Sequence, residues 1–297
     1  MNSSNILVQP KVSIHIVSYN QKDYIAEAIE SAVSQDYLNL EVVISDDAST
    51  DGTAEIVLKY QKLYPQRIFA IFNKQNMGIS KNANHALKSC TGKYIAFQGG
   101  DDVLLPGKIS AQVSWFEQDE NRVLCGHQVE VFYQDGLQKS HLRTKKLAAG
   151  CGAKEIILNG TYGATSIMLR ASELPIGGFN ETIIVSDLML WIETVARGGE
   201  FGFVDGTLAK YRRHSSNVTN DHFGNLLELK KMLLLISIKY PQFKDYCTDS
   251  LIKNVIYTGG VILLKKGEKR KARKRFIEVL TKKPLYIKGW IRLLQSI

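Results

Sequence analysis

Two adjacent aspartates, Asp101 and Asp102, follow the glycine pair Gly99–Gly100 directly after an apolar segment. Adjacent carboxylates repel each other unless water or a cation neutralises them. One or two carboxylates, completed by the phosphates of a substrate, are the usual protein ligands of Mg²⁺. The pair is therefore either part of a solvated loop or, in the functional interpretation, a site for Mg²⁺ or Mn²⁺ beside glycines that let a ligand approach the backbone.

The sequence lacks the two glycine-rich motifs that cradle nucleotide phosphates. Neither GxxxxGK[ST] nor GxGxxG occurs in it. Both motifs bind phosphate through backbone N–H groups at the start of a helix. A nucleotide bound at the acidic pair would therefore be held through a metal ion and carboxylates.

Three other apolar segments are also followed by polar or aromatic residues. Tyr19 follows the first of them, Asp46 and Asp47 begin the sequence DDASTDGT after the second, and Asn76 begins the sequence NMG after the third. Taken one at a time, such residues usually cap helices or form turns. Because parallel strands present their carboxyl ends at one edge of a sheet, the four groups together predict a ligand site at that edge.

Two later segments carry charged groups suited to acid–base chemistry and to phosphate binding. Asp187 opens an apolar helical segment, a position where the helix dipole alone also favours a carboxylate. Arg212 and His214 lie in the sequence YRRHSSN, just after a predicted strand. Arginine binds phosphate oxygens through paired N–H groups, so this segment is either a diphosphate contact or a solvated basic loop.

The spacing of apolar residues places these groups on alternating strands and helices. Short runs rich in β-branched residues predict strands at Val12–Ser18, Leu40–Ser45, Arg67–Phe72 and Tyr94–Phe97. Helical spacing predicts helices between them at Asp23–Gln35, Ala54–Tyr64 and Ile79–Ser89. Strand–helix–strand units of this kind form a parallel sheet that is covered by helices on both faces.

Beyond residue 102 the pattern is mixed and then helical. Helices are expected at Lys108–Glu117 and Asp187–Ala196, and strands at Val123–Tyr133, Thr165–Leu169 and Gly202–Tyr211. The last helices are expected at Leu226–Tyr240, Asp249–Leu264, Lys269–Leu280 and Trp290–Leu294. We expect an α/β domain over residues 1–222, with a nucleotide-binding half at about 11–102 and an acceptor half at about 103–222, followed by a helical basic extension over 223–297.

The positive charge of the chain is confined to this extension. The 297 residues carry a formal net charge of +9, but residues 265–297 hold 12 Lys or Arg against 2 acids, so the other 264 residues have a net charge of −1. Cations beside apolar and aromatic residues at helical spacing suit an anionic membrane surface. A solvated cationic helix packed on the domain is the alternative. No RNA- or DNA-binding motif accompanies the charge, so we expect no nucleic-acid partner.

The sequence shows no export signal and no membrane span. Its first residues, MNSSNILVQPK, lack the basic and apolar regions of a signal peptide. The most apolar segments, Met232–Ile238 and Val261–Leu264, are far shorter than the roughly 20 residues of a membrane span. The 4 cysteines are dispersed without a CxxC pair, as in proteins of a reducing compartment. We therefore expect a cytoplasmic protein, peripheral on the inner face of the cell membrane.

The motifs, taken in order, resemble those of family 2 glycosyltransferases, whose GT-A nucleotide-diphospho-sugar transferase fold is an α/β, Rossmann-like fold with a mixed, mostly parallel sheet. The resemblance covers about residues 11–222. It is carried by the segments VSYN (17–20), DDASTDGT (46–53), NMGISKNAN (76–84), GGDD (99–102), GGFNE (177–181), DLMLW (187–191) and YRRH (211–214).

The resemblance implies a role for each motif residue. It implies that Tyr19 stacks on the base, that Asp47 contacts the uracil ring, and that Asp187 is the general base. It makes Asp101 and Asp102 the metal-motif acids, with Asp102 the principal ligand of Mn²⁺ or Mg²⁺. The nucleotide-binding residues that it implies are Val17, Tyr19, Asp47, Asn76, Lys81 and Asp101, with Arg212 and His214 on the diphosphate side.

The resemblance further implies an inverting enzyme that moves a hexose or N-acetylhexosamine from a UDP-sugar to a glycan acceptor. In bacterial O-antigen and capsule assembly, the setting typical of this family, the acceptor is a lipid-diphosphate-linked oligosaccharide. Because inverting transfer forms no covalent intermediate, one carboxylate serves as its base. The alternative hypothesis is a non-catalytic protein that binds nucleotide sugars, or nucleic acid through its basic tail.

Overall fold

A computed structural model of the chain describes residues 9–134, 138–143, 150–161, 163–184 and 186–297. The chain forms two compact units, the first within residues 1–153 and 161–215 and the second within 154–160 and 216–297. The domain boundary expected at residue 222 stays a prediction. By compact packing, residues 216–222 and the segment 154–160 go with the second unit.

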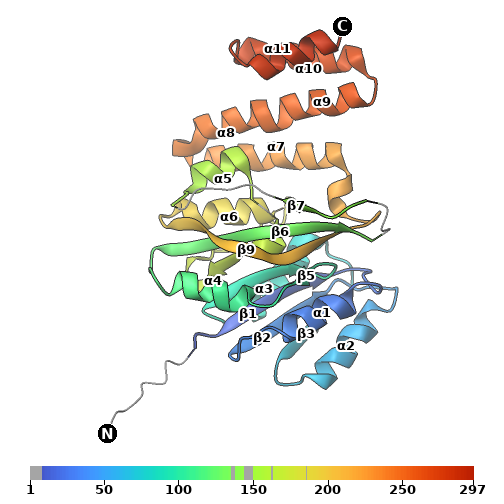
Figure 1. Cartoon of the computed structure of the whole chain (residues 1–297), viewed down its shortest axis with the longest axis vertical. Coiled ribbons are helices and arrows are strands. Elements are labelled where there is room, and N and C mark those ends of the chain that lie inside the picture. The colour runs from blue at the N-terminus through green and yellow to red at the C-terminus, as the bar shows by residue number, and fades with distance from the viewer. Residues whose placement is uncertain (1–8, 135–137, 144–149, 162, 185) are drawn as a thin grey trace. The chain divides into compact units, whose positions relative to one another are not determined.

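The first half of the first unit is a parallel sheet (Figure 1). Its strands β1 (Val12–Ser18), β2 (Leu40–Asp46), β3 (Ile68–Phe72) and β4 (Tyr94–Gly99) lie in the order β3-β2-β1-β4, with every pair parallel. Helices α1 (Ile25–Val33), α2 (Thr53–Leu63) and α3 (Ile79–Ser89) connect successive strands. These elements confirm the predicted strand–helix–strand units, with most boundaries within two residues of those expected.

The second half of this unit adds antiparallel pairs. Strand β8 (Met168–Arg170) is antiparallel to β4 and to β6 (Arg122–Tyr133), whereas β9 (Glu200–Arg213) runs parallel to β6. Two short strands, β5 (Val103–Leu104) and β7 (His141–Arg143), pair with β9 and β6. Helices α4 (Lys108–Phe116) and α6 (Asp187–Ala196) complete the unit. The mixed, mostly parallel sheet is confirmed, but the strand expected at Thr165–Leu169 was wrong at its start, because residues 164–166 form a 3₁₀ turn.

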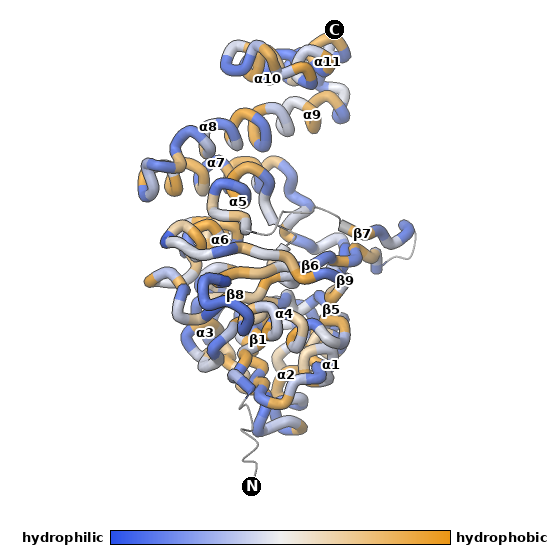
Figure 2. The backbone as a smooth tube through the Cα atoms, turned by 60° about the vertical axis from the view of Figure 1, so that its left-hand side comes forward, coloured by the Kyte–Doolittle hydropathy of each residue, from blue (hydrophilic) through white to orange (hydrophobic). Residues whose placement is uncertain are grey.

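The core of the first unit follows from the composition of its strands. β2 is buried along its whole length, and β1 is buried at all but one position, so both strands have helices or loops on each face. Figure 2 shows apolar residues recurring along the strands. The core joins the strands to α1 and α4 through large side chains, among them Ile14, Ile16, Ile29, Tyr94 and Phe116.

One buried strand residue, His15 of β1, is ionisable. Its Nε2 lies 2.8 Å from the carbonyl oxygen of Ala83, and its ring packs against those of Phe97 and Phe179. Burial lowers the pKa of His15 to about 4, because the imidazolium form would lose its hydration. The ring is therefore neutral at pH 7, and its Nε2–H donates to Ala83.

The second unit is helical, as expected for the extension. It contains α7 (His222–Lys239), α8 (Lys244–Ser250), α9 (Thr258–Lys265), α10 (Lys269–Lys282) and α11 (Ile287–Gln295), together with α5 (Ala153–Asn159) from residue 154 on. The helix expected at Asp249–Leu264 starts earlier, at the beginning of α8, and contains a π-helical stretch at Leu251–Tyr257. Among the described residues, no helix has both the length and the apolar character of a membrane span.

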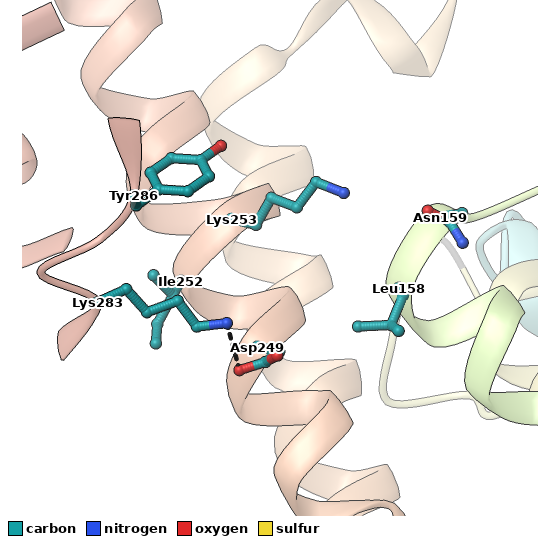
Figure 3. A pocket seen from close by; sticks show the side chains of 7 residues that line it. All are labelled: Leu158, Asn159, Asp249, Ile252, Lys253, Lys283 and Tyr286. Carbon is teal, nitrogen blue, oxygen red and sulfur yellow. Dashed lines mark ion pairs between the residues drawn. The ribbon is translucent and has the colours of Figure 1, made fainter. Parts of the chain in front are cut away.

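A cavity of about 250 Å³ lies within the second unit (Figure 3). On one side, the Nζ of Lys283 pairs with Asp249 at 2.6 Å. None of its lining residues is among the site residues expected from the sequence. Its walls consist of Leu158, Asn159, Asp249, Ile252, Lys253, Lys283 and Tyr286.

The buried histidine gives the fold a specific acid sensitivity. An unfolded-state histidine binds its proton near pH 6.5, whereas His15 resists protonation down to about pH 4 in the folded state. Between these values the unfolded state binds more protons, so the stability that His15 contributes above pH 6.5 is lost as the pH falls. Lowering the pH from 7 to 4 should reduce the free energy of unfolding in both proteins. We expect this reduction to be about 3 kcal/mol smaller in His15→Gln than in the wild type, as measured by urea denaturation.

His222→Gln is the matched control, because His222 is exposed at the start of α7. It should show the wild-type dependence of stability on pH. Equal pH dependence in His15→Gln and the wild type would contradict the neutral, buried state of His15.

Candidate active site

The acidic pair follows Gly99, which ends β4, and Gly100, and a larger residue at either position would displace its neighbours. A Cβ atom on Gly99 would come within 2.6 Å of the Oδ1 of Asp101. A Cβ atom on Gly100 would collide with the side chain of Gln21 and come within 3.0 Å of the carbonyl oxygen of Val17. The backbone N–H of Gly100 donates to that same oxygen at 3.0 Å. Val17, expected near the nucleotide, thus anchors the turn through its backbone.

Asp102 is buried, with 4% of its surface exposed. Its Oδ1 accepts a hydrogen bond from the backbone N–H of Arg212 at 3.1 Å, and its carbonyl oxygen accepts one from Gln98 at 3.0 Å. Burial and the adjacent Asp101 raise the pKa of the Asp102 carboxyl well above its usual range, and Arg212 offsets only part of this. The positive charge of Arg212 therefore compensates the ionised form of Asp102 only in part.

Arg212, at the end of β9, holds the pair from inside the protein. Its Nε donates to the carbonyl oxygen of Asp101 at 2.8 Å, and one Nη donates to Gln134. Its other Nη forms an ion pair with Glu27 of α1. The side chain is 5% exposed, and its guanidinium lies 4.5 Å from the centre of the Phe132 ring. The diphosphate contact expected of Arg212 stays a prediction, while the observed contacts are with the backbone and side chains around the acidic pair.

His214 completes this cluster. Its Nε2 lies 2.9 Å from the Oδ2 of Asp101, and its ring stacks on that of Tyr24 with 4.6 Å between centres. Asp101 and Asp102 are therefore neighbours of Arg212 and His214 in the structure, although more than 100 residues separate the two pairs in the sequence.

The residues present fit a divalent cation with an incomplete protein ligand set. Asp101 and Asp102 supply carboxylate oxygens, the donors that Mg²⁺ and Mn²⁺ prefer, and His214 adds a nitrogen donor. Within the described part of the chain, no three His, Cys, Asp or Glu side chains are grouped so that they could hold a metal ion by themselves. A cation here needs further oxygens from water or from a bound phosphate.

Asp47 is buried where β2 ends, and its carboxylate organises the next loop. Its Oδ1 accepts from the backbone N–H of Met77 at 3.0 Å and from the side chain of Asn73 at 3.1 Å. Its Oδ2 accepts from the backbone N–H of Gly78 at 2.9 Å. The predicted contact of Asp47 with a uracil ring remains untested, but its observed contacts fix the loop that leads into α3.

Tyr19 lies after β1 with its side chain 46% exposed, available to a planar ligand. The next residue, Asn20, has a left-handed backbone (φ 51°). Its N–H donates to the Oγ of Ser49, and its Oδ1 accepts from the N–H of Thr50, both at 2.9 Å. The loops after β1 and β2 are therefore joined directly beside Tyr19.

The motif over residues 76–84 is mainly a set of structural contacts. Asn76 and Lys81, expected near the nucleotide, have exposed side chains. Asn82, by contrast, is buried and donates to the carbonyl oxygen of Ser45 at 3.0 Å, which ties α3 to the end of β2. Asn84 exchanges two hydrogen bonds with the backbone of Phe179, at 2.8 and 2.9 Å.

Asp187 begins α6, and its position is set by α3. The Oγ of Ser80 donates to the carbonyl oxygen of Ile183 at 2.6 Å and lies 2.8 Å from the Oγ of Ser186. These contacts place the start of α6 beside the start of α3. The half-buried Asp187 accepts from the backbone N–H of Leu188 at 2.7 Å.

Several residues of the site were missed by sequence reasoning. Glu27 and Tyr24 looked like ordinary residues at the start of a helix, and Gln134 lies in a segment without a readable pattern. Ser80 lies within a motif and Ser186 lies directly before one. These positions are the only sign in the sequence that the two small polar residues belong to the site. No local signal in the sequence identifies the partner of any of these side chains.

Comparisons with known proteins agree on the family of this chain. The model of "Glycosyl transferase family 2" matches residues 13–173. The putative glycosyltransferase EpsE of Bacillus subtilis is 35% identical over 211 residues, which are 69% of this chain and 74% of EpsE. WfaP of Escherichia coli, a UDP-Glc:alpha-D-GlcNAc-diphosphoundecaprenol beta-1,3-glucosyltransferase, is 30% identical over 77% of this chain and 87% of its own length.

Solved structures show a similar fold. TarS of S. aureus, as residues 1–349 in complex with UDP-GlcNAc, matches with a TM-score of 0.68 and 18% identity over 91% of this chain and 80% of that one. Some matched relatives are longer, since the chain spans 60% of the length of three uncharacterized mycobacterial proteins.

Replacing Asp102 by asparagine should stabilise the metal-free protein. An unfolded-state aspartate ionises near pH 4, whereas folded Asp102 keeps its proton to higher pH. Because the folded state then binds more protons, wild-type stability falls as the pH rises above about 4. The amide avoids this loss, so we expect Asp102→Asn in EDTA to gain ~1 kcal/mol near pH 7, or ~2–4 °C in Tm, and nothing near pH 4.

Asp205→Asn is the control for loss of one negative charge, because Asp205 is exposed on β9. It should leave the Tm close to the wild-type value. A Tm of Asp102→Asn below that of the wild type near pH 7 would show that the carboxylate is adequately compensated without a metal.

Proposed function

Because the chain belongs to glycosyl transferase family 2 and its first unit has the GT-A fold, we propose that it moves a hexose or N-acetylhexosamine from a UDP-sugar to a glycan acceptor with inversion at the anomeric carbon. The observation that carries this proposal is the pair of the half-buried Asp101 and the buried Asp102, whose pKa is raised, at the edge of the sheet where the strand-end loops meet. An acidic pair of this kind suits a cation and a diphosphate together.

The donor is held along the loops that follow β1, β2 and β3. Tyr19 provides an exposed ring for the base, and the Asp47-anchored loop leads to the exposed Asn76 and Lys81. Asp102 and Asp101 would hold Mn²⁺ or Mg²⁺, which would supply positive charge to stabilise the departing diphosphate. Because Arg212 and His214 lie behind these carboxylates, we assign Arg212 a positioning role, with its charge also favouring the anionic leaving group.

Transfer then requires one base for the acceptor hydroxyl. The carboxylate of Asp187 takes the hydroxyl proton as the acceptor oxygen forms its bond to the anomeric carbon, and the bond from that carbon to the diphosphate oxygen breaks with its electron pair leaving on UDP. The support for Asp187 is its tether to the end of β2. The backbone N–H of Gly78 donates to Asp47, and the hydroxyl of Ser80 contacts the segment before α6, so these hydrogen bonds connect the start of α6 to the end of β2.

The acceptor that we propose is a lipid-diphosphate-linked saccharide of O-antigen or capsule assembly. This rests on the similarity to WfaP, whose name gives such an acceptor, with UDP-glucose as donor. A lipid-linked acceptor would keep the enzyme at the inner face of the cell membrane, on the cytoplasmic side where the nucleotide sugar is.

The function is tested by acceptor-dependent release of UDP. Purified protein with MnCl₂ and a short-chain lipid-diphosphate-linked N-acetylglucosamine would be given UDP-glucose, UDP-galactose, UDP-N-acetylglucosamine or UDP-N-acetylgalactosamine in turn. We expect one UDP-sugar to release UDP only when the acceptor is present, and GDP-mannose to release no GDP. Binding of a UDP-sugar without any acceptor-dependent release would favour the non-catalytic alternative.

Replacing Asp187 by asparagine should separate catalysis from binding. The amide keeps the shape of the side chain but cannot take a proton, so we expect transfer to fall by about 10²- to 10⁴-fold. UDP affinity, measured by calorimetry, should stay within about twofold of the wild type, because the nucleotide contacts that we propose lie on other loops. Asp205→Asn, which removes one exposed carboxylate of the same unit, should keep wild-type turnover. Wild-type turnover in Asp187→Asn would rule out Asp187 as the base.

A further inference from the structure

The last helix of the chain, α11, exposes an apolar face. Ile287, Trp290, Ile291 and Leu294 recur at helical spacing, and each is at least 50% exposed. Leu285 and Ile297, on either side of the helix, are exposed as well. An exposed row of this kind is uncommon on a monomeric protein surface and usually marks an interaction site.

The neighbouring helix α10 differs from α11, because its apolar side is packed within the unit. α10 buries its own apolar residues Ala272, Phe276, Val279 and Leu280. Phe276 lies against Gly260 of α9, where a Cβ atom would come within 2.6 Å of its ring. The sequence left open whether the tail packs by its apolar side; for α10 it does, and for α11 that side remains uncovered in the structure.

Cations accompany the exposed face. Lys288 and Arg292 lie on α11 itself, and Lys282 ends α10 shortly before it. The segment over residues 265–297 has 12 Lys or Arg and 2 acids. Those two acids form ion pairs with Lys271 and Arg275 on α10, each three residues away, so neither is paired with a cation of α11.

We propose that this face of α11, defined by Ile287, Trp290, Ile291 and Leu294, docks on an anionic phospholipid surface. The apolar side chains would enter the boundary between headgroups and acyl chains, where a tryptophan ring is favoured. Lys288 and Arg292 would remain at the level of the anionic headgroups. The helix lies in the plane of the surface and does not cross it.

The charge of the segment favours an anionic membrane over a second copy of the chain or a nucleic acid. A second copy docked through the same face would bring two segments with a net charge of +10 together. Nucleic acid would be bound by the cations, but its phosphate backbone leaves an exposed isoleucine–leucine row without a partner. An anionic membrane matches both the charge and the apolar row.

Flotation of the full chain with vesicles, in the absence of substrate, tests the proposal. We expect the protein to float with phosphatidylcholine vesicles that contain phosphatidylglycerol and to stay behind with phosphatidylcholine alone. Ile291→Glu/Leu294→Glu should weaken binding by roughly tenfold or more, because charged residues replace part of the inserted surface. Lys288→Gln/Arg292→Gln should weaken it by about fivefold for each cation removed.

Leu234→Glu/Ile238→Glu is the matched control. These residues lie four positions apart on α7 and are also exposed, at 48% and 76%. This variant should bind vesicles like the wild type, and an unchanged Tm would show that each glutamate pair is tolerated. Wild-type flotation of Ile291→Glu/Leu294→Glu would overturn the proposal.

The fluorescence of Trp290 gives a second readout. Trp191 is fully buried and Trp115 is partly buried, so an emission shift on adding anionic vesicles reports mainly on Trp290. We expect a blue shift in the wild type and none in Trp290→Phe. The face would instead be occupied by a second copy if the wild type did not bind vesicles and its molecular mass in solution doubled with protein concentration. In that case Ile291→Glu/Leu294→Glu should return to the mass of the monomer. These binding experiments use no substrate, so a lack of vesicle binding would not contradict the proposed transferase activity. A lack of transferase activity would likewise not contradict the proposed membrane binding.

Discussion

The structure of the site depends on placing two neighbouring carboxylates, one buried and one half-buried, at the edge of a sheet. Asp102 is nearly inaccessible, and Asp101 lies beside it with the imidazole of His214 against its carboxylate. Such a pair is tolerated when opposite charge and hydrogen bonds are close. Arg212 supplies both, through its backbone N–H and its guanidinium. The remaining deficit of positive charge makes the pair suited to a divalent cation and a diphosphate.

A second constraint is that the base must be delivered from a distant part of the sequence. In the sequence, Asp187 is separated from the loops that follow β1 to β4 by the strands β5 to β8. Helix α3 bridges this separation, because Asn82 contacts the end of β2 while Ser80 contacts the segment before α6. In this account, the polar motif over residues 76–84 contributes to catalysis mainly by positioning other groups.

Sequence patterns predicted the local features well and the long-range contacts poorly. The buried strands and their helices follow from apolar spacing, and the residues at the strand ends follow from the direction of parallel strands. The contacts of Arg212 with Glu27 and Gln134 could not be predicted, because each joins residues far apart through ordinary side chains. The strand that begins at Met168 was predicted to begin at Thr165, because an apolar run does not distinguish a 3₁₀ turn from a strand. Similarly, the composition of the basic tail did not show that the apolar side of α10 is covered and that of α11 is exposed.

In the proposed mechanism, the acidic pair binds a divalent cation together with the nucleotide. Calorimetric titration of UDP into the wild type and Asp102→Ala, in MnCl₂ and in EDTA, tests it most directly. The account predicts that Mn²⁺ raises the UDP affinity of the wild type by roughly tenfold or more and leaves that of Asp102→Ala unchanged. An equal effect of Mn²⁺ on both proteins, or none on the wild type, would contradict it.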